Sequence, residues 1–464
     1  MLKVGIAQST KSGYAAAIKQ FDHFQSTQSD PPLSDLTYEH VNDDWLCKLM
    51  LGFGTYLADT DIEVGSKKLL ASSTKGKYFG KIKEQLKGMF PQHPSWKDEA
   101  SWYTPLLHGV ESGSKRASLR SDEYSDQKCL PIYPTVRNVM VRKKHRGAIL
   151  HGDTEYARDL TSLCFLLMSA CSAIAQGNPL EQRLWIIICA LAVGRGGEIK
   201  FQRYDEWHWD DLFENVDATW TEMKTLTQHC MLFGRNKVGF EFDFFHACAC
   251  YFAVENGLFR ADDMDAAIHK YVFPSLHGIS DASVASTLTT ILRKSVHPHL
   301  KDQISSRSIR KGCTTELSMK VAEKYVNARG GWAESTNSKS YKCTTPFLVL
   351  PGGNALNGWK DVHSAKYAPQ LECLGSHVQD MLEDFMQQLY LISVPDFQPH
   401  GRLRPFLRAC TAALIQQHAN VVRAFGHSHP IVEKVLDAAA KANIHDCELT
   451  EPTAVLRHWA AKIK

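Results

Sequence analysis

The sequence lacks the features that mark membrane and secreted proteins. Its longest unbroken apolar run, residues 184–193, is about half of the roughly 20 residues that span a bilayer, so it predicts a buried helix. Residues 1–6 lack the long apolar core of a secretory signal, which favours a soluble, intracellular protein. The 13 cysteines are odd in number and form no CxxC pair, which favours reduced thiols over a disulfide framework.

Metal-ligand patterns are also scarce. The tightest cluster of suitable residue types is His246, Cys248 and Cys250. Their alternate spacing on a predicted helix points the side chains in different directions, so buried structural roles are favoured over a zinc site. We therefore expect no metal ion.

What is present is the composition of an ordinary folded protein. The 464 residues are 44% hydrophobic and 22% charged, which predicts a packed structure of two to four domains. The net charge of +3 is mild, so the distribution of basic residues is more informative than their number.

Hydrophobic spacing divides the chain into four segments. Residues 1–130 carry three apolar stripes at helical spacing and predict a small helical domain. Residues 131–150 predict a basic linker. Residues 151–345 predict buried helices over 159–175 and 184–193, with a short hairpin or small sheet over 219–233. Residues 346–464 predict a loop over 346–369, then helices near 378–391, 403–425, 430–442 and 452–464. The fold class is mainly α with one small antiparallel sheet.

Basic residues gather in two places. The third predicted helix carries Lys75, Lys77 and Lys81, which form either a solvated face or a phosphate-binding face. The linker carries Arg142, Lys143, Lys144 and Arg146, which suit a nuclear address, a DNA-clamping linker or a soluble hinge.

Three short motifs carry candidate chemistry. The most apolar helix ends in a glycine-rich turn that holds Arg195 and Glu198. Arg307 and Arg310 lie three apart at the start of a predicted helix, so they share one face and can form an anion site. Trp332 precedes Tyr341, which stands in a polar stretch. Taken singly, each motif also fits an ordinary helix cap, a solvated basic turn or a half-exposed tyrosine.

Taken together and in this order, the motifs resemble those of the tyrosine recombinases. That family carries an Arg followed three residues later by Glu or Asp, as at positions 195 and 198. It carries a His-x-x-Arg box opening a helix, matched in part by positions 307 and 310, and a His or Trp nine residues before the nucleophile, as at positions 332 and 341. It also carries a lysine in a hairpin, for which Lys224 is the best match and Lys237 the second. The similarity covers about residues 9–345, and the wording of 192–198 and 308–312 is most similar to crypton-type recombinases of eukaryotic mobile elements.

The resemblance implies DNA strand cleavage and rejoining. The Tyr341 oxygen would attack a phosphodiester, join the enzyme to the 3′ phosphate and release a 5′ hydroxyl. Arg195 and Arg310, assisted by Arg307, would stabilise the negative charge of the transition state. Lys224 would protonate the leaving oxygen. No cofactor is needed, because the phosphotyrosine conserves the bond energy.

Supporting roles follow from the same resemblance. Trp332 would supply an indole donor and packing, and Glu198 would orient Arg195. Lys311 and Lys237 join the basic residues named above as candidate DNA contacts. The expected partner is double-stranded DNA, bound by a dimer on one site and by a tetramer in synapsis, in the nucleus if the host is eukaryotic.

One departure from the family pattern keeps alternatives open. Arg307 stands where most members carry His, and arginine stays charged, so it cannot accept a proton. A catalytically weakened DNA-binding protein of recombinase descent is therefore an alternative. A type IB topoisomerase, which uses similar chemistry, is another, and an unrelated helical scaffold with chance matches is a third.

Overall fold

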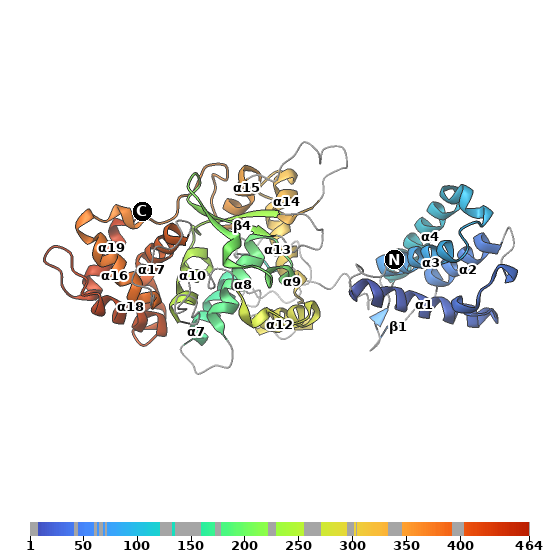
Figure 1. Ribbon diagram of the computed structural model, residues 1–464, viewed down its shortest axis with the longest axis horizontal. Helices are drawn as coiled ribbons and strands as arrows, with labels where there is room; N and C mark the ends of the chain where they lie inside the picture. The colour runs from blue at the N-terminus through green and yellow to red at the C-terminus, as the bar shows by residue number, and fades with distance from the viewer. Residues whose placement is uncertain are drawn as a thin grey trace. The chain divides into compact units, whose positions relative to one another are not determined.

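The computed structural model consists of two compact units, Met1–Lys128 and Cys129–Lys464 (Figure 1). As predicted, the fold is mainly helical with a small antiparallel sheet. Within the ranges that the structure describes, no helix has both the length and the apolar character needed to cross a bilayer. Those ranges are 8–40, 45–59, 63–64, 68–69, 72–120, 132–134, 159–171, 178–220, 229–254, 271–294, 301–302, 304–332, 346–391 and 403–463.

The first unit is a helical bundle with an aromatic core. The three predicted helical stripes correspond to α1, α2 and α3, which each contribute one buried phenylalanine to the core. The ring centroid of Phe53 lies 5.1 Å from that of Phe21 and 6.5 Å from that of Phe79. Helices α2 and α3 both pack against α4, and α1 packs against α3. The elements are α1 (Gln8–Gln28), η1 (Leu33–Asp35), η2 (Tyr38–His40), α2 (Trp45–Asp59), the antiparallel pair β1 (Glu63–Val64) and β2 (Lys68–Leu69), α3 (Ser72–Met89), η3 (Pro94–Asp98) and α4 (Glu99–Arg120).

The second unit contains the predicted catalytic region and the C-terminal segment. Up to the sheet its elements are α7 (Leu160–Ala170), α8 (Pro179–Leu191), α9 (Gly196–Ile199), η5 (Tyr204–Glu206), β3 (Trp207–Asp210), β4 (Asn215–Trp220) and β5 (His229–Phe233). They are followed by η6 (Phe240–Phe242), α10 (Phe244–Val254), η8 (Pro274–Leu276), α12 (Asp281–Lys294), α13 (Arg307–Ser318), α14 (Glu323–Gly330) and α15 (Pro346–Leu356). The last elements are η11 (Leu371–Cys373), η12 (Ser376–Val378), α16 (Gln379–Tyr390), α17 (Leu403–Phe425), α18 (Pro430–Lys441) and α19 (Pro452–Lys462).

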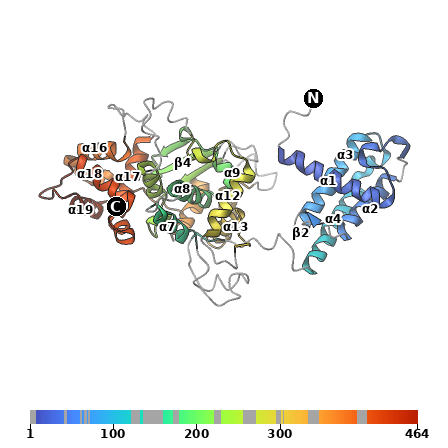
Figure 2. The same cartoon turned by 90° about the horizontal axis from the view of Figure 1, so that it is seen from below.

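Helix α8 is the centre of the second unit. Its residues from Leu184 to Leu191 are all buried, as the apolar run predicted, and the helix begins earlier than expected because Pro179 occupies its first turn. In both views α9, α12 and α13 lie on one side of α8, and α16 to α19 lie on the other (Figures 1 and 2). The elements that carry Arg195 and Arg310 are therefore on the side of α8 away from the C-terminal helices.

The small sheet has three antiparallel strands in the order β3, β4, β5. The predicted hairpin corresponds to β4 and β5, paired with Trp220 opposite His229, and β3 is an additional strand that the sequence did not suggest. The second predicted hairpin strand is found as expected, as β5. Of the first, predicted over 219–223, only residues 219 and 220 are described, and they belong to β4. Lys224, expected at the tip between these strands, lies outside the described residues.

Helix α15 corrects the prediction of a loop over residues 346–369. It spans Pro346–Leu356 despite Pro351 and two following glycines. Its buried Val349 and Leu350 pack with Leu232 of β5, and α15 also packs against α14. Packing against these neighbours outweighs the poor helix propensity of proline and glycine, which is why a propensity argument failed here.

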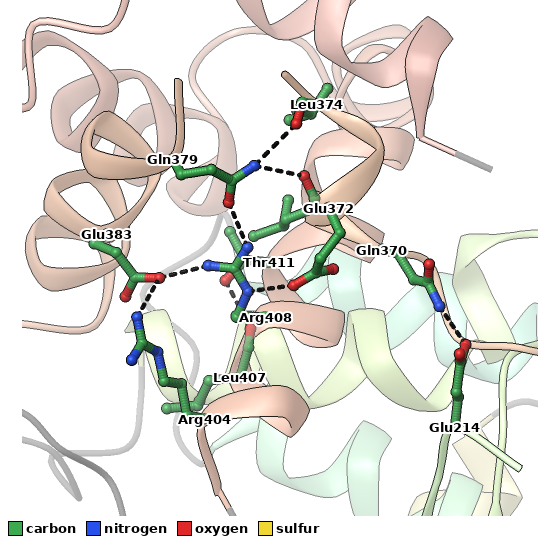
Figure 3. Close-up of polar contacts among 11 residues, drawn as sticks. Glu214, Gln370, Glu372, Leu374, Gln379, Glu383, Arg404, Leu407, Arg408 and Thr411 are labelled. Atoms are coloured by element: carbon green, nitrogen blue, oxygen red, sulfur yellow. Dashed lines mark hydrogen bonds and ion pairs between the residues drawn. The ribbon is translucent and has the colours of Figure 1, made fainter. Parts of the chain in front are cut away.

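Hydrogen bonds and ion pairs around Arg408 of α17 connect the C-terminal helices (Figure 3). Its guanidinium donates to Glu372 at 2.7 Å, to Gln379 at 2.6 Å and to Glu383. Because these acceptors come from η11 and α16, one side chain fixes three elements. The planar fork of arginine is suited to such a multiple contact.

The C-terminal segment shares one hydrophobic core with the predicted catalytic region. That core runs from Ile132 to Ile463 without a break between the two. Phe406 of α17 is 2% exposed, and its ring lies 5.7 Å from Trp207 of β3 and 6.0 Å from Phe252 of α10. Residues 151–345 and 346–464, expected as separate segments, therefore form a single compact unit.

A substitution at Phe406 tests this shared core. We expect Phe406→Ala to destabilise the whole second unit by about 3–5 kcal/mol, because a cavity opens between α17, β3 and α10. The measurement is urea-induced unfolding followed by circular dichroism. Phe347→Ala, at a phenylalanine that is 64% exposed, is the matched control and should cost less than about 1 kcal/mol. A small effect of Phe406→Ala, or its restriction to a separate C-terminal transition, would contradict the shared core.

Candidate active site

The turn that leads into Arg195 is a strained helix terminus. Helix α8 ends in a Schellman motif, in which the amide of Gly194 donates to the Cys189 carbonyl at 3.0 Å and that of Val193 to the Ala190 carbonyl at 3.1 Å. The left-handed position, with φ of 49°, is filled by Val193 rather than by a glycine. A β-branched residue in that conformation costs on the order of 1–3 kcal/mol, and such strain gathers at functional sites.

Gly194 is needed for close packing rather than for the left-handed turn. A Cβ at this position would lie 2.9 Å from the indole ring of Trp220 in β4. The sheet therefore packs directly against the turn that precedes Arg195. The left-handed cap residue is Val193, one position before the glycine-rich turn.

Arg195 and Glu198 form a local pair. Arg195 precedes the short helix α9, and its guanidinium donates to the Glu198 carboxylate, which also accepts from the Arg195 backbone amide at 3.4 Å. The Glu198 side chain is 8% exposed, whereas that of Arg195 is 43% exposed. Glu198 is thus placed to hold the arginine, and the arginine still faces solvent.

Arg310 lies on α13, close to this pair. Its Nη2 donates to the Gly330 carbonyl at 2.9 Å, and its guanidinium carbon lies 4.8 Å from the centroid of the Trp332 ring. Partial burial, and to a smaller extent the positive charge of Arg195, lower the pKa of Arg310 to about 10, although the Glu198 carboxylate acts in the opposite direction. The two arginines, 115 residues apart in sequence, are therefore close enough for the charge of Arg195 to affect the pKa of Arg310.

Trp332 is brought to Arg310 by the end of α14. Gly331 takes the left-handed conformation with φ of 63°, and the Trp332 amide donates to the Asn327 carbonyl at 3.0 Å. The chain turns so sharply that a Cβ at Gly330 would lie 2.4 Å from the Trp332 ring. Glycine at 330 and 331 thus lets the indole fold back beneath the guanidinium of Arg310.

The assembled group carries excess positive charge. Arg195 and Arg310 contribute two cations and Glu198 one anion, so these three side chains sum to +1. An oxyanion bound between the guanidinium groups would relieve their mutual repulsion, and their planar donors match phosphate oxygens. The arrangement can bind a phosphate and stabilise charge that develops on it.

Arg307 makes none of the contacts described above for Arg195, Glu198, Arg310 and Trp332. It begins α13, its side chain is exposed, and its backbone amide donates to the Ser305 hydroxyl at 3.3 Å. Its guanidinium makes no hydrogen bond or ion pair within the described ranges. It shares a helix face with Arg310, one turn away, as the spacing predicted.

Several predicted site residues lie outside the described residues: Tyr341, Lys224, Arg142, Lys143, Lys144 and Arg146. Lys311 is described and exposed on α13. Lys237 is also exposed, but it follows β5, with its ammonium 5.5 Å from the Trp359 ring. It does not lie between β4 and β5, so its assignment as a second candidate for the hairpin lysine is wrong.

The predicted basic face of α3 needs a correction. Lys75 is 3% exposed, so its ammonium group is not on a surface that a phosphate could reach. Helical spacing alone did not reveal that this position turns toward the interior of the bundle. Lys77 is exposed, and Lys81 is half-buried with its ammonium 5.0 Å from the Tyr14 ring.

His246, Cys248 and Cys250 are fully buried in α10, as predicted. The His246 ring nitrogen lies 3.1 Å from the guanidinium of buried Arg183, and burial holds the pKa of this histidine well below its ordinary value. In the part of the chain that is described, no three His, Cys, Asp or Glu side chains are grouped to hold a metal ion.

The residue that the sequence reasoning missed is Arg329. It lies three positions before Trp332, is fully buried and donates to three main-chain carbonyls. The adjacent glycines 352 and 353, which approach its side chain, are the signal that could have drawn attention to it.

No protein-family model matches the chain, and no curated protein matches it at a significant level.

Proposed function

We propose that this chain is a site-specific DNA recombinase or transposase that works through a covalent 3′-phosphotyrosine at Tyr341. The observation that carries the proposal is that the Arg310 guanidinium lies over the Trp332 ring, close enough to Arg195 for the charge of Arg195 to act on it. Three motifs that are distant in sequence supply one cationic, half-exposed group, in the order that the tyrosine recombinase pattern has. A scaffold with chance matches gives no reason for these side chains to converge.

The proposed reaction is an exchange of phosphate esters. The Tyr341 oxygen, having released its proton to solvent water, forms a bond to phosphorus as the bond to the 5′ oxygen of the next nucleotide breaks. Lys224 gives the leaving 5′ oxygen its proton, and a second 5′ hydroxyl later reverses the step on a new partner. Arg195 and Arg310 stabilise the charge on the non-bridging oxygens, and removing one such donor from an active site commonly costs about 10²–10³ in rate.

The arginines also assist the nucleophile. A free tyrosine has a pKa of about 10, and nearby cations favour the phenolate. Glu198 takes part only by holding Arg195, since its carboxylate is already paired. Binding of DNA by the basic residues is expected to weaken steeply with salt, because counterions are released from the phosphates.

The direct test is to trap and map the covalent product. The protein is incubated with a library of labelled, nicked duplexes whose central region is randomised, so that no target sequence need be known in advance. Denaturing gels should show a protein–DNA adduct, and mass spectrometry of its peptides should locate the nucleotide on Tyr341. An adduct on a different residue, or none across the library, would reject the proposal.

Arg307 favours a second candidate, a DNA-binding protein of recombinase descent with weak or absent catalysis. Its exposed guanidinium can bind a phosphate oxygen but cannot accept a proton. This candidate predicts that the duplex library is bound and selected by sequence without any adduct.

Restoring histidine at this position tests the second candidate. If a missing proton acceptor limits the reaction, Arg307→His should increase the yield of adduct per bound duplex by up to about 10²-fold. Arg307→Gln, which removes the charge without adding a base, is the control and should give no increase. Equal yields from the three proteins would show that this departure does not limit catalysis.

A further inference from the structure

Arg329 of α14 joins three other elements of the second unit. Its Nε donates to the Leu191 carbonyl in the last turn of α8. Its Nη2 donates to the Leu232 carbonyl of β5 at 2.8 Å, and its Nη1 to the Val349 carbonyl of α15 at 3.2 Å. One side chain therefore connects a helix end, a strand and two helices.

The burial of this arginine is energetically costly. It is fully buried, and within the described ranges its guanidinium contacts no carboxylate. Burial lowers its pKa to about 9, as expected for a cation whose described partners are three carbonyl dipoles and the Phe233 ring, 5.9 Å away. A neutral, apolar side chain would fill this space at lower cost, so simple packing does not account for the arginine.

The backbone of α15 is shaped around the same side chain. A Cβ at Gly353 would lie 3.1 Å from Arg329 Nη1, and one at Gly352 would lie 3.4 Å from its aliphatic part. Two adjacent glycines lower the propensity of a helix that already contains Pro351. The close approach of Arg329 to α15 supplies a physical reason for them.

The carbonyls that Arg329 binds belong to the supports of the candidate active site. Leu191 lies four residues before Arg195, within the strained end of α8. On the side of α14, the residue after Arg329 is Gly330, whose carbonyl accepts from Arg310, and Trp332 follows. The same arginine thus fixes the distance between the turn that carries Arg195 and the turn that receives Arg310.

We propose that Arg329 is a positioning residue, which holds the Arg195 turn and the Trp332 turn in one geometry. It also fixes α14 to α15, the two described elements between which the chain passes through Tyr341. This inference rests on the proposed function, and it assigns to Arg329 no contact with substrate. Its effect is expected on the chemical step rather than on DNA affinity, because the basic surface is unchanged.

The main test compares two buried arginines. Arg329→Met should slow adduct formation at saturating DNA by about 10- to 100-fold, the size of effect that a misplacement of about 1 Å can have. The dissociation constant for DNA should change less than about threefold, since phosphate contacts on the surface dominate affinity. Arg183→Met is the matched control, because Arg183 is also fully buried and bonded to the Phe240 and Glu241 carbonyls, away from Arg195.

A spectroscopic readout is independent of activity. The indole N–H signals of the 10 tryptophans are recorded by ¹H–¹⁵N NMR, and that of Trp332 is identified by its loss in Trp332→Phe. Arg329→Met should shift the Trp332 signal, whereas Arg183→Met should not. If the wild-type protein forms no adduct, the proposed function fails, but this signal still decides the role of Arg329.

A milder variant covers the case in which Arg329→Met does not fold. Gly353→Ala keeps the arginine and improves the helix propensity of α15, but its methyl group pushes Nη1 away from the Val349 carbonyl. It should shift the Trp332 signal in the same direction by a smaller amount. If both variants have the same Trp332 signal as Arg183→Met, and the same rate of adduct formation at saturating DNA, Arg329 has no positioning role.

Discussion

Replacing Tyr341 with phenylalanine is expected to abolish the covalent adduct while leaving DNA binding intact. The substitution removes one oxygen atom, and that oxygen is the proposed nucleophile. A phenyl ring has no oxygen with which to attack phosphorus, so the loss should exceed the detection range of the assay. The measurement is adduct yield on denaturing gels with the duplex sequence recovered from the wild-type protein, together with DNA affinity by fluorescence anisotropy.

Tyr325→Phe is the control for this experiment. Tyr325 lies on α14, and its ring contacts His363 with centroids 5.5 Å apart. It removes the same atom from the same unit, and we expect wild-type adduct yield. An adduct that persists in Tyr341→Phe, or that is lost equally in both variants, would exclude Tyr341 as the nucleophile.

Replacing Arg310 with alanine should reduce the rate of adduct formation by about 10²–10³-fold, since a preorganised donor to the developing charge is lost. Arg310 is the more buried arginine of the pair, and it is held by the Gly330 carbonyl and the Trp332 ring. Arg310→Lys should recover little of this rate, because an ammonium group lacks the planar fork. Single-turnover rates at saturating DNA measure the effect on the chemical step.

Thermal unfolding separates this catalytic loss from a structural one. Burial and the neighbouring Arg195 both disfavour the charge on Arg310, so we expect Arg310→Ala to melt at the same temperature as the wild-type protein or higher. Arg423→Ala, at an exposed arginine of α17, is the control for nonspecific charge effects. A variant that melts lower but reacts at the wild-type rate when folded would show that Arg310 supports the fold and not the reaction.

The sequence was informative where residue type alone decides the outcome. The apolar run 184–193 predicted the buried helix α8, and the aromatic stripes predicted the helices of the first unit. The motif spacing predicted that positions 195, 310 and 332 belong together. The structure has the Arg310 guanidinium over the Trp332 ring, with Arg195 near enough for its charge to lower the pKa of Arg310. The roles of Tyr341 and Lys224 remain predictions.

Other features depended on long-range packing. Residues 346–356 contain proline and glycine and predicted a loop, yet contacts with β5 and Arg329 hold them as α15. The left-handed residue at the end of α8 is Val193, a β-branched residue that local preference disfavours there. Lys75 sits on a basic helix but faces the interior. In each case, contacts with residues distant in sequence determine the conformation or burial, so a local sequence pattern could not predict the outcome.

The shared core of the second unit decides where this chain can be divided for crystallisation or domain exchange. A fragment ending at residue 345 would leave Trp207, Phe244 and Phe252 without the ring of Phe406 that covers them. Exposed aromatic surface of that kind promotes aggregation. A usable cut lies near Lys128, at the limit between the two compact units, and any exchange of catalytic regions must carry the C-terminal helices with it.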